Sequence, residues 1–523
     1  DGDAGVDTLT AKFDVSNDAG LAVIPQISNI EQLQITNSDT STNTDLLTVN
    51  LAGISGLTKL MNTTSSDNVT FADVENMVSL DLKSAAGTTT VDFQKGALSG
   101  AADNLVITVK GTNGTTVALT DNDALQGNNV ETITIDSLSV ANTIDDLQST
   151  GVATGALVVT GDKKLTITTA LDAEILSVDA SANTGGLVLT NSPTFANATI
   201  TGSAAADTID APTGVTAITG GAGNDFVTFD ATLTAADSFD GGDGVDTVKI
   251  NGGNLTQTSV VGGLSNVEIL ELSTAHTISL ESNISPTTFD FGTNETNQVL
   301  NLLDGYTAAT TVKLGSDATN ADKIVNTANV DLTITANSTS YDETTSVTGG
   351  TGTDSISILN TANGQVDLTA TTGVDSITFT DYTAGVDVEL DTHSYTLDAT
   401  YKAKVLTIDA SSMDAGEVFT LTGDATVTKM DVTAGGGDDL LVLGTLADTV
   451  DGGAGNDSVT GTAGSNTISL GAGNDTLLAG TGGENVDGGA GNDLFTLAGN
   501  LNSGDTIDGG DGTDTLTITS GIT

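Results

Sequence analysis

Acidic residues that could bind a cation recur in this chain beside closely spaced glycines. The segments GGAGNDFVT (220–228), GGAGNDSVT (452–460) and GGAGNDLFT (488–496) share the pattern G-G-x-G-x-D-x-U-x, in which U is a large apolar residue. Glycine permits the positive φ angles of tight turns, and inward carbonyl oxygens of such a turn can join the carboxylate at position six. Calcium prefers oxygen ligands of this kind. The pattern therefore predicts calcium-binding turns, each followed by a short strand that directs U into the interior.

From residue 434 to residue 496 the nonapeptide runs without a gap. Two nonapeptides complete one coil of a solenoid, so each row of turns is expected to recur at every second nonapeptide. The run therefore predicts a parallel β-roll with a core of apolar U residues. These are Leu441, Val450, Val459, Ile468, Leu477, Val486 and Phe495.

Position six differs between alternate copies, which lie on opposite edges of the predicted roll. One edge, the Asp439 column, carries Asp439, Asp457, Asp475 and Asp493, preceded by Asp438, Asn456, Asn474 and Asn492. The other edge, the Asp448 column, carries Asp448, Asn466 and Glu484 and has fewer glycines. We expect about three calcium ions between successive turns of the Asp439 column, and weak or no binding in the Asp448 column. The candidate calcium-binding turns also contain Gly453, Gly455, Gly471, Gly473, Gly489 and Gly491.

The same register occurs earlier in the chain. Residues 202–228 hold three contiguous copies, of which only the last is complete, and single copies lie at 2–10, 241–249, 349–357 and 509–517. For the single copies two interpretations stay open, a calcium site and a glycine turn without an ion. The candidate ligand positions in these copies are Asp207, Asp225, Asp7, Asp246, Asp354 and Asp514, with Gly221 and Gly223.

Composition agrees with a chain held together by several calcium ions. The 523 residues include 69 acidic and 13 basic side chains, for a net charge of −56, and no cysteine. Such a charge repels phosphate backbones and anionic lipid, which argues against nucleic-acid partners. Disulfides are excluded as the cross-link, and no apolar stretch is long enough to span a bilayer. Bound calcium is the remaining candidate for holding the loops.

The chain also repeats on a larger scale. Residues 220–250 and 488–518 match closely at a shift of 268, and ISNIEQLQI (27–35) resembles LSNVEILEL (264–272). Alternating apolar residues between the glycine blocks predict short strands of a β-solenoid or a sandwich, and Gly161-Asp162 within 157–168 is suited to a hairpin. We expect an elongated all-β protein in which β-roll segments alternate with irregular β-rich segments. The expected segments are 1–201 (β-rich), 202–240 (short roll), 241–433 (β-rich), 434–508 (roll) and 509–523, the start of a further unit in a longer array.

No catalytic residue can be nominated. The chain has two histidines, His276 and His393, and neither an H-E-x-x-H nor a G-x-S-x-G motif occurs. No carboxylate pair stands out from the calcium pattern. We therefore expect a protein that is not an enzyme.

The uninterrupted G-G-x-G-x-D run at 434–496 resembles the RTX (repeats-in-toxin) proteins of Gram-negative bacteria. Single GGDGxDTL motifs with (L/I)SN(V/I)E-x-L segments, as at 27–33 and 264–270, resemble the RTX-type surface-layer branch of that family. The resemblance implies type I secretion in an unfolded form and calcium-dependent folding outside the cell. It also implies self-assembly into a coat at the cell surface, with attachment to surface polysaccharide or lipopolysaccharide through calcium as a further possibility. Two alternatives remain, the calcium-rigidified stalk of a large RTX adhesin and the secretion module of an RTX exoenzyme.

Overall fold

The computed structural model of the chain is built from short β-strands. Every named element of the described residues is a strand, and Gly263 is the single helical residue among them. The part of the chain that the structure describes includes no helix with the length and apolar character needed to cross a membrane. The described residues are 5–15, 20–38, 46–94, 96–98, 102–121, 129–150, 153–172, 175–190, 198–212, 214, 216–230, 233–234, 236–252, 263–282, 284–292, 297–315, 321–328, 330–337, 345–359, 371–380, 393–396, 405–423, 429–497, 501 and 503–519.

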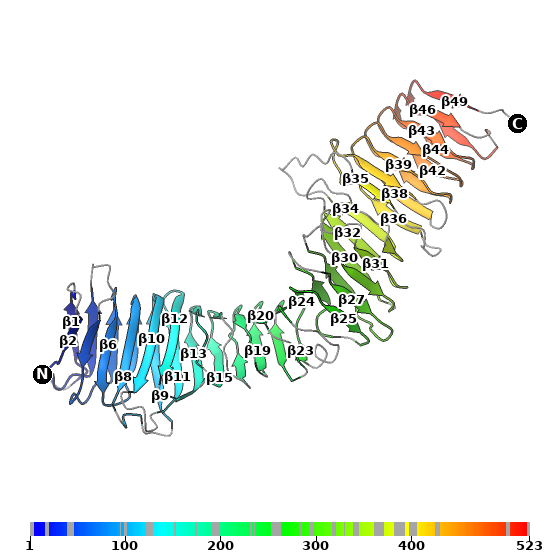
Figure 1. The fold of residues 1–523 in the computed structure, drawn as a ribbon. Helices are drawn as coiled ribbons and strands as arrows, with labels where there is room; N and C mark the ends of the chain where they lie inside the picture. Colours follow the sequence, from blue (N-terminus) through cyan, green and yellow to red (C-terminus); the bar gives the residue numbers. More distant parts are fainter. Residues whose placement is uncertain are drawn as a thin grey trace. The chain divides into compact units, whose positions relative to one another are not determined.

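The strands form two units, 1–253 with 258–269 and 254–257 with 270–523. In the first unit each coil contributes one strand to each of two parallel sheets, and the strands stack in chain order (Figure 1). One sheet contains β1 (Thr8–Phe13), β3 (Gln32–Asn37), β5 (Lys59–Thr63), β7 (Ser79–Lys83), β9 (Asn104–Lys110), β11 (Asn129–Leu138), β13 (Ala153–Gly161), β15 (Ser177–Asn183), β17 (Ala198–Thr201), β19 (Thr216–Ala222), β21 (Ser238–Asp243) and β23 (Leu264–Ser265). The other contains β2 (Leu21–Val23), β4 (Leu47–Asn50), β6 (Val69–Val74), β8 (Gly87–Phe93), β10 (Asn113–Asp121), β12 (Asn142–Thr150), β14 (Leu165–Ile167), β16 (Leu187–Leu189), β18 (Thr208–Asp210), β20 (Phe226–Phe229) and β22 (Thr247–Ile250).

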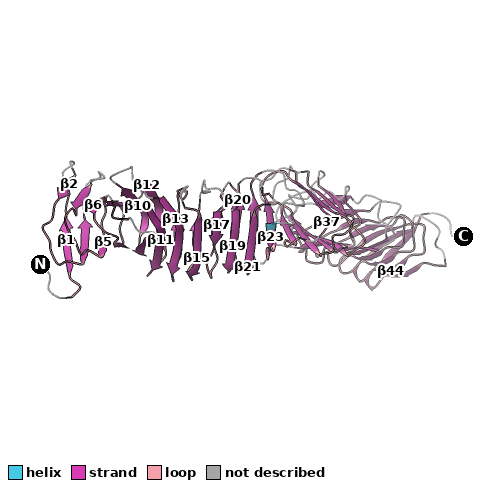
Figure 2. Cartoon of the chain, turned by 90° about the horizontal axis from the view of Figure 1, so that it is seen from below, coloured by secondary structure: helices cyan, strands magenta, loops and turns pink. Residues whose placement is uncertain are grey.

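The second unit repeats this arrangement (Figure 2). On one side its strands form two successive parallel sheets. The first sheet contains β25 (Thr277–Leu280), β27 (Val299–Leu302), β29 (Lys323–Asn326), β31 (Ser346–Thr348) and β33 (Thr371–Thr372). The second sheet contains β35 (His393–Thr396), β37 (Phe419–Thr422), β39 (Leu440–Val442), β41 (Ser458–Thr460) and β43 (Thr476–Ala479). The latter sheet continues with β46 (Leu494–Leu497) and β49 (Thr515–Ile518). The facing strands are β24 (Ile269–Leu272), β26 (Thr288–Asp290), β28 (Thr310–Lys313), β30 (Leu332–Asn337), β32 (Asp354–Leu359), β34 (Ser376–Thr380), β36 (Val405–Asp409), β38 (Lys429–Thr433), β40 (Thr449–Asp451), β42 (Thr467–Ser469), β44 (Asn485–Asp487) and β47 (Thr506–Asp508). A small pair, β45 (Ala490–Gly491) and β48 (Asp511–Gly512), joins two turns.

The core of the C-terminal roll is a stack of U residues in register. Val459 pairs with Leu441 on one side and with Leu477 on the other, and all three are at most 1% exposed. The two partners lie two nonapeptides before and two nonapeptides after Val459, which confirms the coil length predicted from the sequence. Burying one apolar side chain per strand is enough here because every coil covers its neighbours.

The segments between the glycine blocks are coils of the same solenoid. In the first unit Leu105 pairs with Ile133 and Ile107 with Ile135, and all four side chains are fully buried. These partners lie further apart in the chain than those of the roll, because longer strands with alternating burial make a wider coil. A sandwich is therefore excluded for these segments, and the all-β parallel solenoid is confirmed.

Two expectations about connections differ from the structure. Residues 157–168 form no hairpin, because β13 and β14 lie in different sheets and pair with β15 and β16 in parallel; Gly161, at φ 100°, turns the corner. The expected boundary at 240/241 also shifts, because residues 241–249 stack directly on 220–228 through Gly221 and Gly242 in β19 and β21. Likewise, 509–517 continues the roll through β46 and β49.

Adjacent leucines in β43 provide a test of this core. Leu477 is fully buried whereas Leu478 is 40% exposed. Leu477→Ala should destabilise the roll by about 2–5 kcal/mol through lost burial and a cavity, and Leu478→Ala by about 0.5 kcal/mol or less. Urea unfolding in saturating calcium measures both, and equal losses would contradict the inward assignment of U.

Candidate calcium sites

Position-six acids form buried columns linked through the backbone. The Asp439 amide donates to Asp457 Oδ1 (2.8 Å), the Asp457 amide to Asp475 Oδ1 (2.7 Å), and the Asp475 amide to Asp493 Oδ1 (2.9 Å). The Asp493 amide then donates to Asp514 Oδ1 (3.0 Å). The column thus has five acids rather than the four predicted, because Asp514 stacks on Asp493 although 21 residues separate them in the chain. It has four gaps between turns, one more than expected.

The second carboxylate oxygen in most of these turns has no donor. Oδ2 of Asp457, Asp475 and Asp493 is buried without a hydrogen-bond partner, and the same holds for Asp225 and Asp246 in the first unit. Each of these side chains is at most 1% exposed. A buried, unsatisfied charged oxygen is strongly destabilising, so the arrangement requires a compensating proton or cation.

Space for a cation lies beside four of these five oxygens, at the first glycine of the motif, whereas the motif of Asp475 begins with Leu470. A Cβ on Gly452 would lie 2.8 Å from Asp457 Oδ2 and 2.5 Å from the Leu470 carbonyl oxygen of the next coil. A Cβ on Gly488 would meet Asp493 Oδ2 at 2.7 Å and the Gly509 carbonyl oxygen at 2.5 Å. Any side chain would fill this space, whereas glycine leaves it bordered by hard oxygens from two coils. The residues present therefore fit calcium.

The backbone at position two decides whether the carboxylate oxygen stays free. In the Asp457 turn Gly453 has φ 89°, and its amide donates to Asp451 (3.2 Å), outside the motif. In the Asp439 turn the Gly435 amide instead donates to Asp439 Oδ2 (3.1 Å). Positive φ, which glycine adopts without strain, turns the amide away from the carboxylate. We call these open and closed turns.

Open turns have a glycine at positive φ at position two: Gly221, Gly242, Gly453, Gly471, Gly489 and Gly510. Closed turns occur at Asp207 and Asp354, whose Oδ2 atoms accept from the Ser203 and Gly350 amides at 2.6 Å. In Asp207, Asp354 and Asp439 both carboxylate oxygens are therefore hydrogen-bonded to protein. The position-four glycines, Gly223, Gly455, Gly473 and Gly491, also have positive φ and allow close stacking of coils.

The Asp448 column shares the backbone ladder, but only one of its three motifs begins with glycine, at Gly461. The Asp448 amide donates to Asn466 Oδ1 (2.9 Å) and the Asn466 amide to Glu484 Oε2 (3.2 Å). A Cβ on Gly461 would face Asn466 Nδ2 and the Gly480 amide nitrogen, each at 3.3 Å, which cannot ligate calcium, and Glu484 Oε1 at 3.7 Å. Asp448 Oδ2 and Glu484 Oε1 are buried without a close hydrogen-bond partner. Burial raises the pKa of both acids, and the Gly444 and Gly480 amides partly offset this rise in pKa. The difference in calcium binding between the two columns stays a prediction.

Residues at position five form a separate ladder on the exposed side of the turns. The Asn456 side chain donates to Asp438 Oδ1 (3.0 Å), Asn474 to Asn456 Oδ1 (3.3 Å), and Asn492 to Asn474 Oδ1 (3.0 Å). The structure thus joins these predicted ligand side chains to one another. Burial is the largest cause that raises the pKa of Asp439, Asp457 and Asp475, and the negative charge of Asp438 raises it further.

Two of the four copies that look single in the sequence, 241–249 and 509–517, are stacked on other glycine motifs. The Asp225 amide donates to Asp246 Oδ1 (2.8 Å), so 241–249 extends the first unit's column, Asp207–Asp225–Asp246. Asp7 Oδ2 is unpartnered as well, but Gly2 of that motif lies outside the described residues. Sequence reasoning missed Asp505, which accepts from the Glu484 amide (3.0 Å) and continues the Asp448 column. Its segment GDTID resembles ADTVD at 447–451, a signal that could have found it.

Burial and neighbouring negative charge raise the pKa of Asp225 and Asp457 in the absence of metal. Burial, followed by the charges of Asp439 and Asp475, raises the pKa of Asp457 to about 7. Burial with the charges of Asp207 and Asp246 likewise raises the pKa of Asp225 to about 7. A cation in the adjoining space would reverse these shifts by favouring the charged carboxylate.

Within the described residues no three His, Cys, Asp or Glu side chains converge on one metal position. Each candidate site instead combines one carboxylate with backbone carbonyls. This combination is typical of the turns of calcium-binding parallel β-solenoids. The family model of the RTX calcium-binding nonapeptide repeat (four copies) matches residues 196–231, 433–468, 444–477, 460–495 and 502–521. The chain therefore carries RTX calcium-binding repeats, which supports its assignment to the RTX family. No curated protein matches the chain.

Replacing one acid in each kind of turn tests the assignment. Asp457→Asn and Asp475→Asn should each remove calcium from the Asp439 column, because the amide keeps the ladder acceptor but lacks the charge. Asn466→Ala and Glu484→Gln, in the Asp448 column, should leave the number of bound ions unchanged. Equilibrium dialysis with radioactive calcium counts the ions, and equal losses in the two columns would refute the distinction.

The raised pKa values predict how the calcium-free protein responds to pH. Because these acids have a higher pKa in the folded state than in the unfolded chain, the folded state binds protons more tightly. This proton binding stabilises the fold, and its contribution is complete below about pH 4, the pKa of an unfolded aspartate. It is lost as the pH rises to about 7, the folded pKa of Asp457 and Asp225. Circular dichroism in calcium-free buffer should show more β-structure at pH 5 than at pH 8, with a smaller difference in the Asp457→Asn/Asp475→Asn double variant. A signal independent of pH would contradict the prediction.

Proposed function

We propose that the chain is a secreted structural protein that folds on meeting calcium outside the cell and self-assembles into a surface layer or a related extracellular sheet or filament. The observation that carries the proposal is the two-sided surface of its C-terminal roll. One sheet of the roll is uncharged and partly apolar, whereas the opposite sheet is acidic. In a chain with a net charge of −56, an uncharged face is where copies meet with least repulsion.

The uncharged face is the sheet of β37, β39, β41, β43, β46 and β49. These described strands contain no acidic or basic residue. They expose Leu440 (42%), Leu478 (40%) and Leu494 (38%) between rows of threonine and serine. Exposed apolar side chains on a flat, otherwise uncharged sheet favour protein–protein association.

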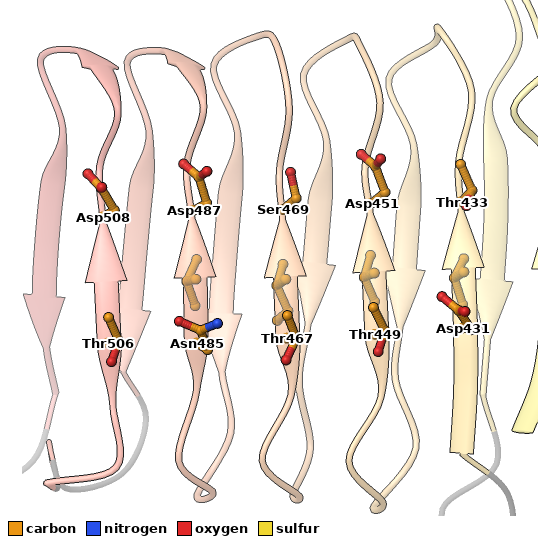
Figure 3. Close-up of a pocket in the computed structure, with 14 residues that line it drawn as sticks. Asp431, Thr433, Thr449, Asp451, Thr467, Ser469, Asn485, Asp487, Thr506 and Asp508 are labelled. Carbon is orange, nitrogen blue, oxygen red and sulfur yellow. The ribbon is translucent and has the colours of Figure 1, made fainter.

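The acidic face is the sheet of β38, β40, β42, β44 and β47, along which a shallow groove runs. Figure 3 shows Asp451, Ser469, Asp487 and Asp508 in one row and Thr449, Thr467, Asn485 and Thr506 in a second. Two such faces in contact would bring rows of carboxylates together. Association through the opposite sheet avoids that repulsion.

Extracellular location follows in this proposal from the calcium requirement. The unneutralised acids of the columns destabilise the metal-free fold, and extracellular modules bind calcium with dissociation constants of roughly 10⁻⁴ to 10⁻³ M. The chain would then stay open where calcium is scarce and fold where it is abundant. RTX repeat proteins are typically secreted, which agrees with this order of events.

A second candidate is the stalk of a large adhesin. Parallel pairing continues from coil to coil within each unit, and such stacked coils suit a stiff spacer. A stalk needs calcium-dependent folding but no association between copies. A test of assembly in calcium therefore separates the stalk from the surface layer.

Electron microscopy and sedimentation of the chain with and without calcium test the proposal. Wild-type protein should form sheets or filaments in millimolar calcium and disperse on chelation. Leu440→Asp/Leu494→Asp should bind calcium normally yet remain monomeric, whereas Thr449→Asp/Thr467→Asp on the acidic face should still assemble. A folded, calcium-loaded wild-type monomer would refute self-assembly and favour the stalk.

A further inference from the structure

The LSNVE segment, residues 264–268, lies outside the repeats that the family model matches and has no role in the sites above. It forms the coil that follows the last glycine motif of the first unit. β23 pairs with β21, and Glu268 Oε2 accepts the Asp246 amide at 2.7 Å. Glu268 thus accepts the Asp246 amide in the same way as Asp246 accepts the Asp225 amide. The turn that contains Glu268, however, has no glycine motif.

The Asp246 turn is open, and its carboxylate lacks a partner. Asp246 is fully buried, Oδ1 accepts the Asp225 amide, and Oδ2 makes no hydrogen bond. Gly242, at position two, has φ 96°. The unit therefore ends on an acid whose second oxygen still requires a cation or a proton.

The LSNVE segment supplies an oxygen at the corresponding position. A Cβ on Gly241 would lie 2.4 Å from Asp246 Oδ2 and 2.0 Å from the Asn266 carbonyl oxygen. One coil earlier, a Cβ on Gly220 would meet Asp225 Oδ2 at 2.2 Å and the Gly241 carbonyl oxygen at 2.5 Å. The Asn266 carbonyl thus replaces the glycine carbonyl of a repeat.

Asn266 reaches this position through an unusual backbone conformation. Its φ is 49°, which asparagine tolerates better than most residues, and its side chain donates to Asp240 Oδ1 at 2.7 Å. The related segment at the start of the chain repeats the arrangement. Asn29 has φ 53°, and Glu31 Oε2 accepts the Asp7 amide at 2.8 Å.

We propose that the LSNVE segment completes a calcium site at the end of the first unit's column. The ion is bound by Asp246 Oδ2 and the Asn266 carbonyl oxygen, and Glu268 is a positioning residue that holds the Asp246 backbone and adds negative charge. The LSNVE segment thus supplies the carbonyl ligand to the last turn of the column, as the next nonapeptide does for a turn inside the roll. The inference rests on calcium binding by the repeats but not on assembly between copies.

Paired substitutions at Asn266 separate its backbone from its side chain. Asn266→Gly keeps the carbonyl and tolerates positive φ, so the calcium count should not change. Asn266→Val disfavours positive φ because it is β-branched, and should lose one ion per chain. Equilibrium dialysis of the full chain against radioactive calcium measures both, and equal counts in the two variants would overturn the role of the carbonyl.

Substitution of the acids tests the rest of the site. Asp246→Asn should lose one ion, while Asp243→Asn, an exposed acid in the same turn, should lose none. Glu268→Gln keeps a hydrogen-bond acceptor and should weaken one site about tenfold, with an unchanged unfolding midpoint in calcium-free buffer. If wild type binds calcium and Asp246→Asn binds as many ions, this site does not exist. If wild type binds none, the calcium-dependent function fails as well.

Discussion

Buried carboxylate oxygens that receive no hydrogen bond are the constraint around which this molecule is organised. Stacking the coils places the acids of successive turns in one column, and the backbone amide of each coil satisfies only one oxygen of the next acid, as with Asp457 and Asp475. Where the first motif residue is glycine, as at Gly452 beside Asp457, the remaining oxygen faces space for a cation. A cation there neutralises the column and joins two coils through ligands from both. Cation binding at these positions would couple folding to metal binding.

The distinction between open and closed turns explains why similar sequences need not bind equally. A glycine at positive φ turns the position-two amide away from the carboxylate, as at Gly453, whereas the amide of Gly435 satisfies Asp439 directly. In the closed turn the protein itself supplies a donor for the second oxygen. Asp207 and Asp354 belong to this second kind. One solenoid thus combines turns that leave a buried carboxylate oxygen without a donor and turns that supply that donor.

Charge is distributed so that the fold and its surface have separate roles. Carboxylates of the columns are inside the turns, those of the groove lie along β40, β44 and β47, and the opposite sheet has none. Calcium in the columns would remove the internal repulsion while leaving the surface asymmetric. That asymmetry favours association through one face, which is the basis of the proposed assembly.

The sequence by itself determined the parallel β-roll, its coil of two nonapeptides and the position-six columns, because a strict period fixes both the turns and the inward apolar side chain. It also distinguished the Asp439 column from the Asp448 column through glycine content. Only the tertiary structure decided that 241–249 and 509–517 are stacked rather than isolated, since longer coils interrupt the period there. The open or closed state of each turn, and the part played by Asn266 and Glu268, depend on backbone angles and on contacts between coils. Neither can be deduced from the spacing of residues along the chain.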